Sequence, residues 1–258
     1  MTSQIRHTWY MTVRHLRSLA RQPWYMAITL VQPVIYLLLF GALFQRIVQI
    51  PGFGSSSYVT FLLPGVVVMT ALFSASWNGM SMIEDIDRGV MDRFLVSPVR
   101  RSALITGRIV QIAVVTIIQS IVIVLLGWAR GASFPNGIVG IGVLVLASIL
   151  LAAPFGVLSN GLALVARKEE TLIGASQFVI LPLTFLASVF MARPLMPRWV
   201  QNVATYNPLD WAVRAGREAM SASVNWGVVW SHIGYLTAFA LVSGWLATRA
   251  FRAYQRSV

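Results

Sequence analysis

Six long stretches of the sequence contain almost no Asp, Glu, Lys or Arg and are rich in aliphatic and aromatic residues. An α-helix needs about 20 apolar residues to cross the hydrocarbon core of a bilayer, which is about 30 Å thick. Each stretch is long enough, and charged side chains are rare in lipid because their burial there is unfavourable. The helices are expected near residues 24–45, 58–82, 104–128, 138–166, 171–191 and 228–248. The sequence therefore predicts an all-α membrane protein with six transmembrane helices.

The six stretches leave little of the chain outside the membrane. Hydrophobic residues make up 57% of the sequence and charged residues 11%, whereas about 25% of the residues in ordinary soluble domains are charged. We expect one transmembrane domain over residues 1–258, in which 24–248 form the six-span bundle and 249–258 a cytoplasmic tail. The chain has no cysteine, which excludes disulfide bonds, thiol catalysis and cysteine-ligated metal ions.

The basic residues indicate which side of the membrane each loop faces. The formal net charge is +12, but most Lys and Arg residues stand at the ends of apolar stretches, a pattern typical of membrane topology and not of nucleic-acid binding. With both termini inside, the cytoplasmic segments hold 14 of the 20 Lys and Arg residues. Because cytoplasmic loops are enriched in basic residues, we expect both termini on the inner side of a bacterial inner membrane. Arg108 lies within the third stretch, and its side chain is expected to reach back to the membrane interface.

Two segments outside the spans have features of their own. Residues 1–22 place Ile5, Trp9 and Val13 on one helical face and arginines on the neighbouring face. This pattern predicts an amphipathic helix on the cytoplasmic membrane surface; the alternative is a basic anchor that only sets topology. The outer segment 193–218 carries four arginines, so we expect short helices at the outer surface there instead of a plain loop.

The sequence lacks the chemistry of a catalytic or energy-converting site. A phosphate-binding P-loop requires G-x-x-x-x-G-K-[ST], but the single lysine, Lys168, stands between Arg167 and Glu169. No acidic residue lies deep in a span, where proton- or sodium-driven carriers place ionisable groups. His232, in the last span, is interpreted as a packed or interfacial residue. No metal-ligand spacing or nucleophile–base pair is evident, so we expect a membrane channel or carrier that has no energy source of its own, is not an enzyme and binds no cofactor itself.

Half of the chain's acidic residues lie between the second and third stretches. Four of the eight fall within residues 84–92, interleaved with arginine. Glu84 and Arg88 have the i,i+4 order that stabilises a helix, and Pro98 ends it because the residue before a proline disfavours helical geometry. The pattern predicts a short amphipathic helix over 84–98 that contacts another protein. A solvated loop is the alternative, and charge alone does not separate the two.

Three segments in the same order resemble the ABC-2 type permeases. EDIDRGVMDRFLVSPVRR (84–101) is similar to the loop that follows their second span, and YVTFLLPGVVVM (58–69) is similar to that span itself. NPLDWAVRAGR (207–217) carries their N-P-[LFM]-x-x-x-[VA]-x-x-x-R signature. Within this family the chain resembles the daunorubicin/doxorubicin-resistance-like permeases. One departure is Ala187-Ser188, where many relatives have Ser-Gly.

This resemblance implies a half-transporter. Two permease chains, identical or paralogous, would pair with two copies of a separate ATP-binding subunit that binds Mg-ATP. Residues 1–22 would be the connecting helix and 84–98 the coupling helix that contacts the ATP-binding subunit, with a second contact in the loop after the fourth span. The residues implied in coupling are Glu84, Asp85, Arg88, Gly89, Asp92, Arg93, Ser97, Pro98, Arg167 and Glu169.

The resemblance also places residues along a transport route. Spans two and five would line the translocation path between two permease chains, and 193–218 would form short re-entrant helices at the outer side. The residues implied are Met69, Phe73, Trp77, Phe178, Leu181 and Phe185 on the path, and Asn207, Pro208, Asp210 and Arg217 in the outer motif. The alternative for the path residues is ordinary lipid-facing or helix-packing surface. The spacing further predicts ion pairs of Arg214 with Asp210 and with Glu218.

The implied function is export of hydrophobic or amphipathic molecules, such as drugs or antibiotics, driven by ATP. Methionine and aromatic residues suit large polarizable substrates. Export of a lipid, a lipid-linked glycan or sodium within the same family is one alternative. A membrane scaffold with no transport path is another, and it predicts no nucleotide-hydrolysing partner. A secondary carrier that works alone is disfavoured by the lack of ionisable residues deep in the spans.

Overall fold

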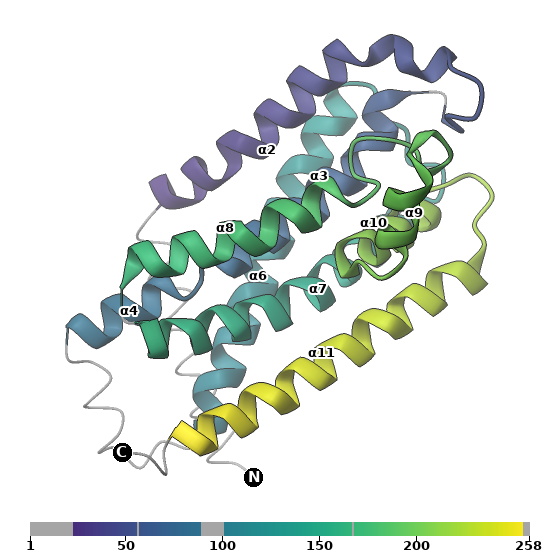
Figure 1. Ribbon diagram of the computed structural model, residues 1–258. Helices are drawn as coiled ribbons and strands as arrows, with labels where there is room; N and C mark the ends of the chain where they lie inside the picture. The colour runs from purple at the N-terminus through teal and green to yellow at the C-terminus, as the bar shows by residue number, and fades with distance from the viewer. Residues whose placement is uncertain (1–22, 56, 89–100, 167, 255–258) are drawn as a thin grey trace.

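Helices form all of the regular structure in the described residues of the computed structural model, which are 23–55, 57–88, 101–166 and 168–254 (Figure 1). The predicted all-α class is therefore confirmed. The predicted helix over 1–22 lies outside the described residues, whereas the last helix continues into residues that were predicted as a tail. The α-helices are α2 (Pro23–Leu43), α3 (Tyr58–Ser76), α4 (Met80–Asp87), α6 (Arg101–Ala129), α7 (Gly137–Ala166), α8 (Glu169–Phe185), α9 (Arg198–Thr205), α10 (Pro208–Ala219) and α11 (Trp226–Tyr254), with 3-10 turns η1 (Gln45–Gln49) and η2 (Arg193–Leu195).

Four helical stretches among the described residues are long and apolar enough to cross a membrane. They are Tyr58–Glu84, Gly107–Ala129, Gly137–Ala166 and Trp226–Trp245. α2 contains a shorter apolar stretch, Ala27–Leu43, and α8 has 17 residues, or about 26 Å at 1.5 Å per residue. Because a bilayer core is about 30 Å thick, the count of six spans stays a prediction. α7 is continuous through Pro154.

α3 is the innermost helix of the bundle. It packs against α2, α6, α7, α8 and α10, while α7 packs against α6, α10 and α11 on its other sides. In the most apolar window of the Tyr58–Glu84 stretch, 78% of the residues are buried, compared with 28% in the corresponding window of α11. α3 is therefore a core element of one chain over most of its length. The fully enclosed core residues include Leu62, Leu63, Val66, Leu72, Leu144, Leu151, Val213 and Leu236.

Small residues allow α7 and α10 to approach closely, as is typical of helix pairs in membranes. A Cβ added to Gly140 of α7 would lie 2.6 Å from the carbonyl oxygen of Ala219, at the end of α10. A Cβ added to Gly216 of α10 would lie 2.4 Å from the side chain of Leu144. The same carbonyl of Ala219 accepts a hydrogen bond from Asn136 Nδ2 at 2.8 Å. Backbone contact and a polar bond therefore hold the two helices together at this end.

Gly140→Ala is expected to lower the free energy of unfolding by about 1–3 kcal/mol, because its new methyl group would meet backbone that cannot rotate away. Gly142→Ala on the same helix is the matched control, since a Cβ there meets no atom within 4 Å and alanine favours a helix by about 1 kcal/mol over glycine. The midpoint of thermal unfolding of each variant is measured in detergent, with size-exclusion chromatography as the readout. Equal midpoints for the two variants would contradict the close contact.

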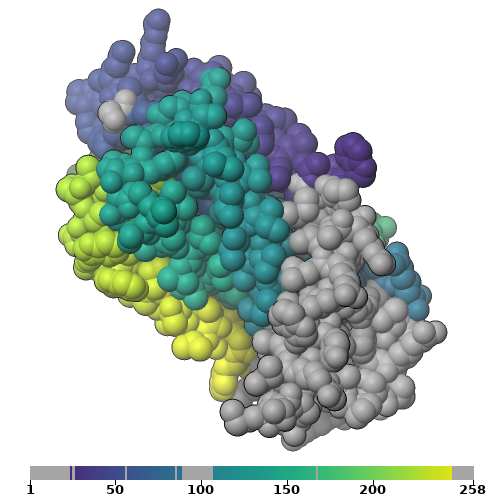
Figure 2. Space-filling model, turned by 180° about the vertical axis from the view of Figure 1, so that it is seen from behind, coloured from purple at the N-terminus to yellow at the C-terminus, as the bar shows by residue number. Residues whose placement is uncertain are grey.

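The outer surface of the bundle is apolar where α6 and α11 face outward. Ile117, Ile121 and Leu125 of α6 are exposed and lie four residues apart, so they share one helical face. Leu241 and Trp245 of α11 are also exposed. Seen from behind, α6 and the start of α7 form the middle of the surface and α11 lies beside them (Figure 2). Such faces are suited to contact lipid chains.

The ends of the helices fall into two groups at opposite ends of the bundle (Figure 1). α4, the junction of α7 with α8, and the end of α11 lie at one end. η1, α9 and α10 lie at the other. The short helices α9 and α10 confirm that segment 193–218 is not a plain loop. Among the described residues, the helix ends at α4, at the junction of α7 with α8 and at the end of α11 were assigned to the cytoplasm, whereas η1, α9 and α10 were assigned to the outer side; which end faces the cytoplasm stays a prediction.

Candidate functional site

The joint between α3 and α4 is built from backbone groups and serine hydroxyls. α3 ends at Ser76 and a break separates it from α4, so two helices, not one, occupy the predicted span over 58–82. The carbonyl that this break frees at Ser76 accepts hydrogen bonds from Ser159 Oγ of α7 and, at 3.3 Å, from Ser176 Oγ of α8. The N–H of Gly79 donates to Ser159 Oγ at 3.0 Å, and a Cβ on Gly79 would lie 2.5 Å from the Ser159 carbonyl oxygen. Any movement of α4 is therefore connected to α7 and α8.

Arg108 of α6 binds α4 and α7 at the same joint. Its Nη1 donates to Ser81 Oγ at 3.1 Å and to Asn160 Oδ1 at 2.9 Å, and its Nη2 lies 3.2 Å from Met82 Sδ. Ser81 Oγ donates in turn to the Asn78 carbonyl at 2.8 Å. These groups supply the polar partners that a charged side chain near the end of a span requires, and the expectation that Arg108 reaches the membrane interface stays a prediction.

α4 is amphipathic, with one face inside the bundle and one face outside. Met82 and Ile83 are buried in a small cluster with Ala163 and Leu172, whereas Glu84, Asp87 and Arg88 are exposed. Glu84 and Arg88 form the predicted i,i+4 pair at 3.5 Å. An exposed pair of this kind contributes at most about 1 kcal/mol to stability, so the charged face is available for a partner.

The predicted coupling segment is only partly described. α4 begins at Met80 and ends at Asp87, so the predicted start at 84 is wrong, and the described acidic residues Glu84, Asp85 and Asp87 lie at the end of a helix. The part of the predicted helix over 84–98 that begins at residue 89 lies outside the described residues. Asp85 belongs to α4, and Glu169 is exposed in the first turn of α8, where an acidic residue favours the helix dipole. Gly89, Asp92, Arg93, Ser97, Pro98 and Arg167 lie outside the described residues. The role of the segment stays a prediction.

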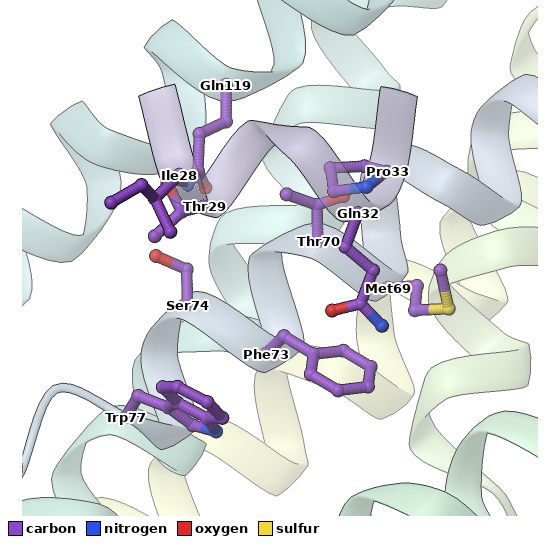
Figure 3. Close-up of a pocket in the computed structure, with 10 residues that line it drawn as sticks. All are labelled: Ile28, Thr29, Gln32, Pro33, Met69, Thr70, Phe73, Ser74, Trp77 and Gln119. Carbon is purple, nitrogen blue, oxygen red and sulfur yellow. Dashed lines mark hydrogen bonds between the residues drawn. The ribbon is translucent and has the colours of Figure 1, made fainter. Parts of the chain in front are cut away.

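Three of the predicted path residues meet in one pocket of ≈ 190 Å³ between α2, α3 and α6 (Figure 3). Met69, Phe73 and Trp77 line it on successive turns of α3. The other three predicted path residues do not reach it: Phe178, Leu181 and Phe185 of α8 are 82%, 47% and 69% exposed. The predicted path residues therefore fall into two separate places in one chain, a pocket beside α3 and an exposed face on α8.

Asn207 organises the opposite end of the bundle. Its Oδ1 accepts from the N–H of Leu209 at 2.9 Å and so caps α10, as short polar side chains do at helix starts. Its Nδ2 donates to the carbonyls of Leu183 and Leu186 at 2.7 and 3.2 Å, at the end of α8. α8 ends at Phe185, so the predicted helix over 171–191 is too long. Pro208 occupies the first turn of α10, where proline is well tolerated.

Asp210 and Arg217 of the outer motif meet at Ser188. Asp210 is fully buried, and its Oδ1 accepts hydrogen bonds from the Ser188 N–H at 2.8 Å and from Ser188 Oγ. Arg217 Nη2 donates to the carbonyl of Ser188 at 2.8 Å and to that of Phe61 at 3.2 Å, and its guanidinium carbon lies 3.7 Å from the centre of the Phe61 ring. Burial lowers the pKa of Arg217 to about 10 and Asp210 opposes this shift, so the guanidinium stays charged at neutral pH.

The predicted ion pairs of Arg214 are wrong, because both carboxylates have other partners. Asp210 is turned inward to Ser188, and Glu218 accepts from the N–H of Asn225 at 3.0 Å. The four arginines of segment 193–218, which are many for an outer loop, are partly explained by hydrogen bonds within the chain. Arg193 donates to the carbonyl of Gln201 at 2.9 Å and to Thr205 Oγ1.

Sequence reasoning missed several polar residues that hold the helices together. The available signal was that Ser188 departs from the family pattern and that Ser159 and Gln119 each belong to a pair of polar residues within an apolar stretch. His232, interpreted as packed or interfacial, is buried with its Nδ1 2.7 Å from the Val228 carbonyl oxygen. Among the residues that the structure describes, no three His, Asp or Glu side chains gather as a metal site.

Comparisons with known proteins identify the family of this chain. The sequence is similar to the daunorubicin resistance ABC transporter permease protein DrrB1 of Streptomyces coeruleorubidus, with 28% identity over 231 residues, 88% of this chain and 78% of that protein. It is 30% identical to the putative transport permease ycf38 of Cyanophora paradoxa over 80% of this chain and 71% of that protein. It is 22% identical to the probable multidrug ABC transporter permease YbhR of Escherichia coli K12 over 76% of this chain and 53% of that protein. The family model of the ABC-2 type transporters matches residues 6–221. The chain therefore belongs to the ABC-2 type transporter family.

Proposed function

We propose that the chain is the permease subunit of an ATP-driven exporter. Membership of the ABC-2 type transporter family carries this proposal. The absence of a P-loop from the sequence supports a separate ATP-binding subunit as the source of energy. The complex contains two permease chains and two ATP-binding subunits that bind Mg-ATP, and this chain carries no catalytic site.

The exposed charged face of α4 is the surface that contacts the ATP-binding subunit. Two observations support this assignment. The face carries Glu84, Asp87 and Arg88 at the end of the bundle that the basic residues place in the cytoplasm. The buried face of α4 is held by Arg108 and Ser159, so that a push on α4 moves α6 and α7 with it. The second contact is formed by the loop that precedes Glu169.

The chain crosses the inner membrane of a bacterium six times, with both termini in the cytoplasm. The four long apolar helices, together with α2 and α8, support six crossings. α8 alone is too short to cross the bilayer core. The buried residues Ala187, Val189 and Ala192 that follow it lengthen this apolar part of the chain. The helices α9 and α10 form the re-entrant structure at the outer side.

The exported molecules are hydrophobic or amphipathic, such as drugs or antibiotics. The names of two relatives, a daunorubicin resistance permease and a probable multidrug permease, support this class. The pocket on α3 supports it as well, because Met69, Phe73 and Trp77 are suited to bind polarizable aromatic molecules. The second permease chain packs against the exposed face of α8 that carries Phe178 and Phe185. The translocation path then lies between the two chains.

Arg88→Glu is expected to reduce ATP-driven export by about tenfold, because reversing one charge at a contact surface weakens docking of the partner by about 1.4 kcal/mol or more. Arg46→Glu is the matched control: it is the same change at an exposed residue of η1, at the opposite end of the bundle. Glu84→Ala should reduce export as well, since it removes the partner of Arg88 on the same face.

The measurement is copurification of the tagged chain from native membranes, with ATPase and drug-efflux assays on the complex. A stoichiometric P-loop ATPase that is lost from Arg88→Glu and retained by Arg46→Glu is the expected result. A chain that purifies without a nucleotide-hydrolysing partner would leave the scaffold interpretation in its place.

A further inference from the structure

The pocket between α2, α3 and α6 has two chemically different sides (Figure 3). Its apolar side is formed by side chains that include Phe73 and Trp77, and Trp77 is 36% exposed, so the pocket opens to the surface there. Its polar side comes from all three helices and consists of Thr29, Gln32, Thr70, Ser74 and Gln119. None of the ten residues that line the pocket carries a charge. The pocket therefore has hydrogen-bonding groups and no ion to pair with a charged ligand.

Gln119 is the polar residue whose hydrogen bonding is incomplete. It lies on α6, is only 2% exposed, and donates from Nε2 to Thr29 Oγ1 at 3.2 Å. Its Oε1 has no hydrogen-bond partner within the described part of the chain. Several other buried polar atoms there also lack a partner, but Gln119 is the one residue among them that lines this pocket. A buried carbonyl oxygen without a donor is unfavourable, so a ligand that brings an N–H or O–H group would satisfy it.

The aromatic side chains and the size of the pocket limit what can enter. Phe73 and Trp77 offer ring faces that stack on a planar group and attract a cation, whereas an anion would find no Arg or Lys among the lining residues. A volume of ≈ 190 Å³ is smaller than the about 300–1,000 Å³ of sites that enclose a drug-sized ligand. One end of a larger molecule therefore fits, and the remainder extends past Trp77.

We propose that this pocket binds the hydrogen-bond-donating end of a planar, neutral or cationic aromatic molecule, with Gln119 Oε1 as the acceptor. The proposal rests on the proposed function and adds the chemistry that selects among its substrates. Aromatic molecules whose amines are fully alkylated lack the donor and should bind more weakly. Anionic aromatic molecules should be excluded.

The test compares two cationic dyes on the full chain in lipid nanodiscs without ATP, by fluorescence polarisation. Rhodamine 6G carries secondary amines and donates hydrogen bonds, whereas tetramethylrhodamine ethyl ester carries tertiary amines and has no N–H donor. The wild-type chain is expected to bind the first dye about tenfold more tightly, as the loss of one buried hydrogen bond implies. Gln119→Leu should remove this preference by weakening only the first dye, and Gln119→Glu, which keeps an acceptor, should retain it.

Gln111→Leu is the matched control. Gln111 lies two turns earlier on α6, its Oε1 is also buried without a partner in the described residues, and it does not line the pocket. This variant should bind both dyes as the wild-type chain does. Equal affinity of the wild-type chain for the two dyes would overturn the proposal even if a variant failed to fold. An equal effect of Gln111→Leu and Gln119→Leu, or a loss of both dyes in Gln119→Leu, would also overturn it.

The two proposals fail in distinguishable ways. If the dye preference and its loss in Gln119→Leu are found but efflux does not depend on ATP, the results support the binding site and refute the exporter function. If the complex exports rhodamine 6G with ATP but binds both dyes equally, the results support the exporter function and refute the role of Gln119.

Discussion

Asp210→Ala is expected to lower the free energy of unfolding by about 3 kcal/mol. The carboxylate is fully buried and accepts both the N–H and the hydroxyl of Ser188. Its removal leaves these donors without an acceptor and leaves Arg217 without the anion that opposes its desolvation. Because Ser188 follows α8 and Arg217 reaches α3, the loss is expected to loosen the whole outer end. Thermal and denaturant unfolding in detergent, followed by size-exclusion chromatography, measures it.

Two further variants separate the contribution of charge from that of hydrogen bonding. Asp210→Asn keeps an oxygen that can accept from Ser188 and should lose less stability than Asp210→Ala. Glu218→Ala removes an acidic side chain from the same helix, where the carboxylate accepts one N–H from Asn225 and is not fully buried, and should lose about 1 kcal/mol or less. A similar loss of unfolding free energy in Asp210→Ala and Glu218→Ala would refute the claim that buried Asp210 is a main source of stability at this end of the bundle.

Arg108→Met is expected to reduce ATP-driven export by about tenfold or more while the protein still inserts and purifies. Methionine keeps the apolar stem of the side chain but loses the donors to Ser81 and Asn160. A hydrogen bond that involves a charged group contributes about 1.5–3 kcal/mol. Its loss therefore lowers the equilibrium constant for packing of α4 against α6 and α7 by a factor of ten or more. Efflux and ATPase activity of the complex should be measured together, because the expected defect is ATP hydrolysis that no longer drives export.

Arg130→Met is the control for this change, since Arg130 is exposed just beyond the other end of α6. Asn160→Leu removes one acceptor of Arg108 and should give a smaller defect in the same direction. Wild-type export by Arg108→Met would show that α4 is held without this arginine, through the bond of Gly79 to Ser159 and the buried cluster of Met82 and Ile83.

The positions of the long helices follow from hydropathy. α2, α6 and α7 begin and end within three residues of their predicted bounds, because a segment in lipid must satisfy its own backbone hydrogen bonds and must exclude charge over a fixed length. The basic residues also sorted the connecting segments into two groups, and the described parts of these groups lie at opposite ends of the bundle (Figure 1). The short helices between the fifth and sixth apolar stretches were predictable from proline and from the otherwise unexplained arginines.

The helix ends and the polar contacts required the tertiary structure. α3 breaks before Gly79 and α8 ends at Phe185, and in both places the freed carbonyls find donors on helices far away in the chain: Ser159 in one case and Asn207 in the other. Arg108 likewise finds its acceptors, Ser81 and Asn160, on other parts of the chain. Local sequence shows that such a residue is polar in an apolar stretch but not which partner it has, because the partner lies tens of residues away and only the packing of the helices brings the two together.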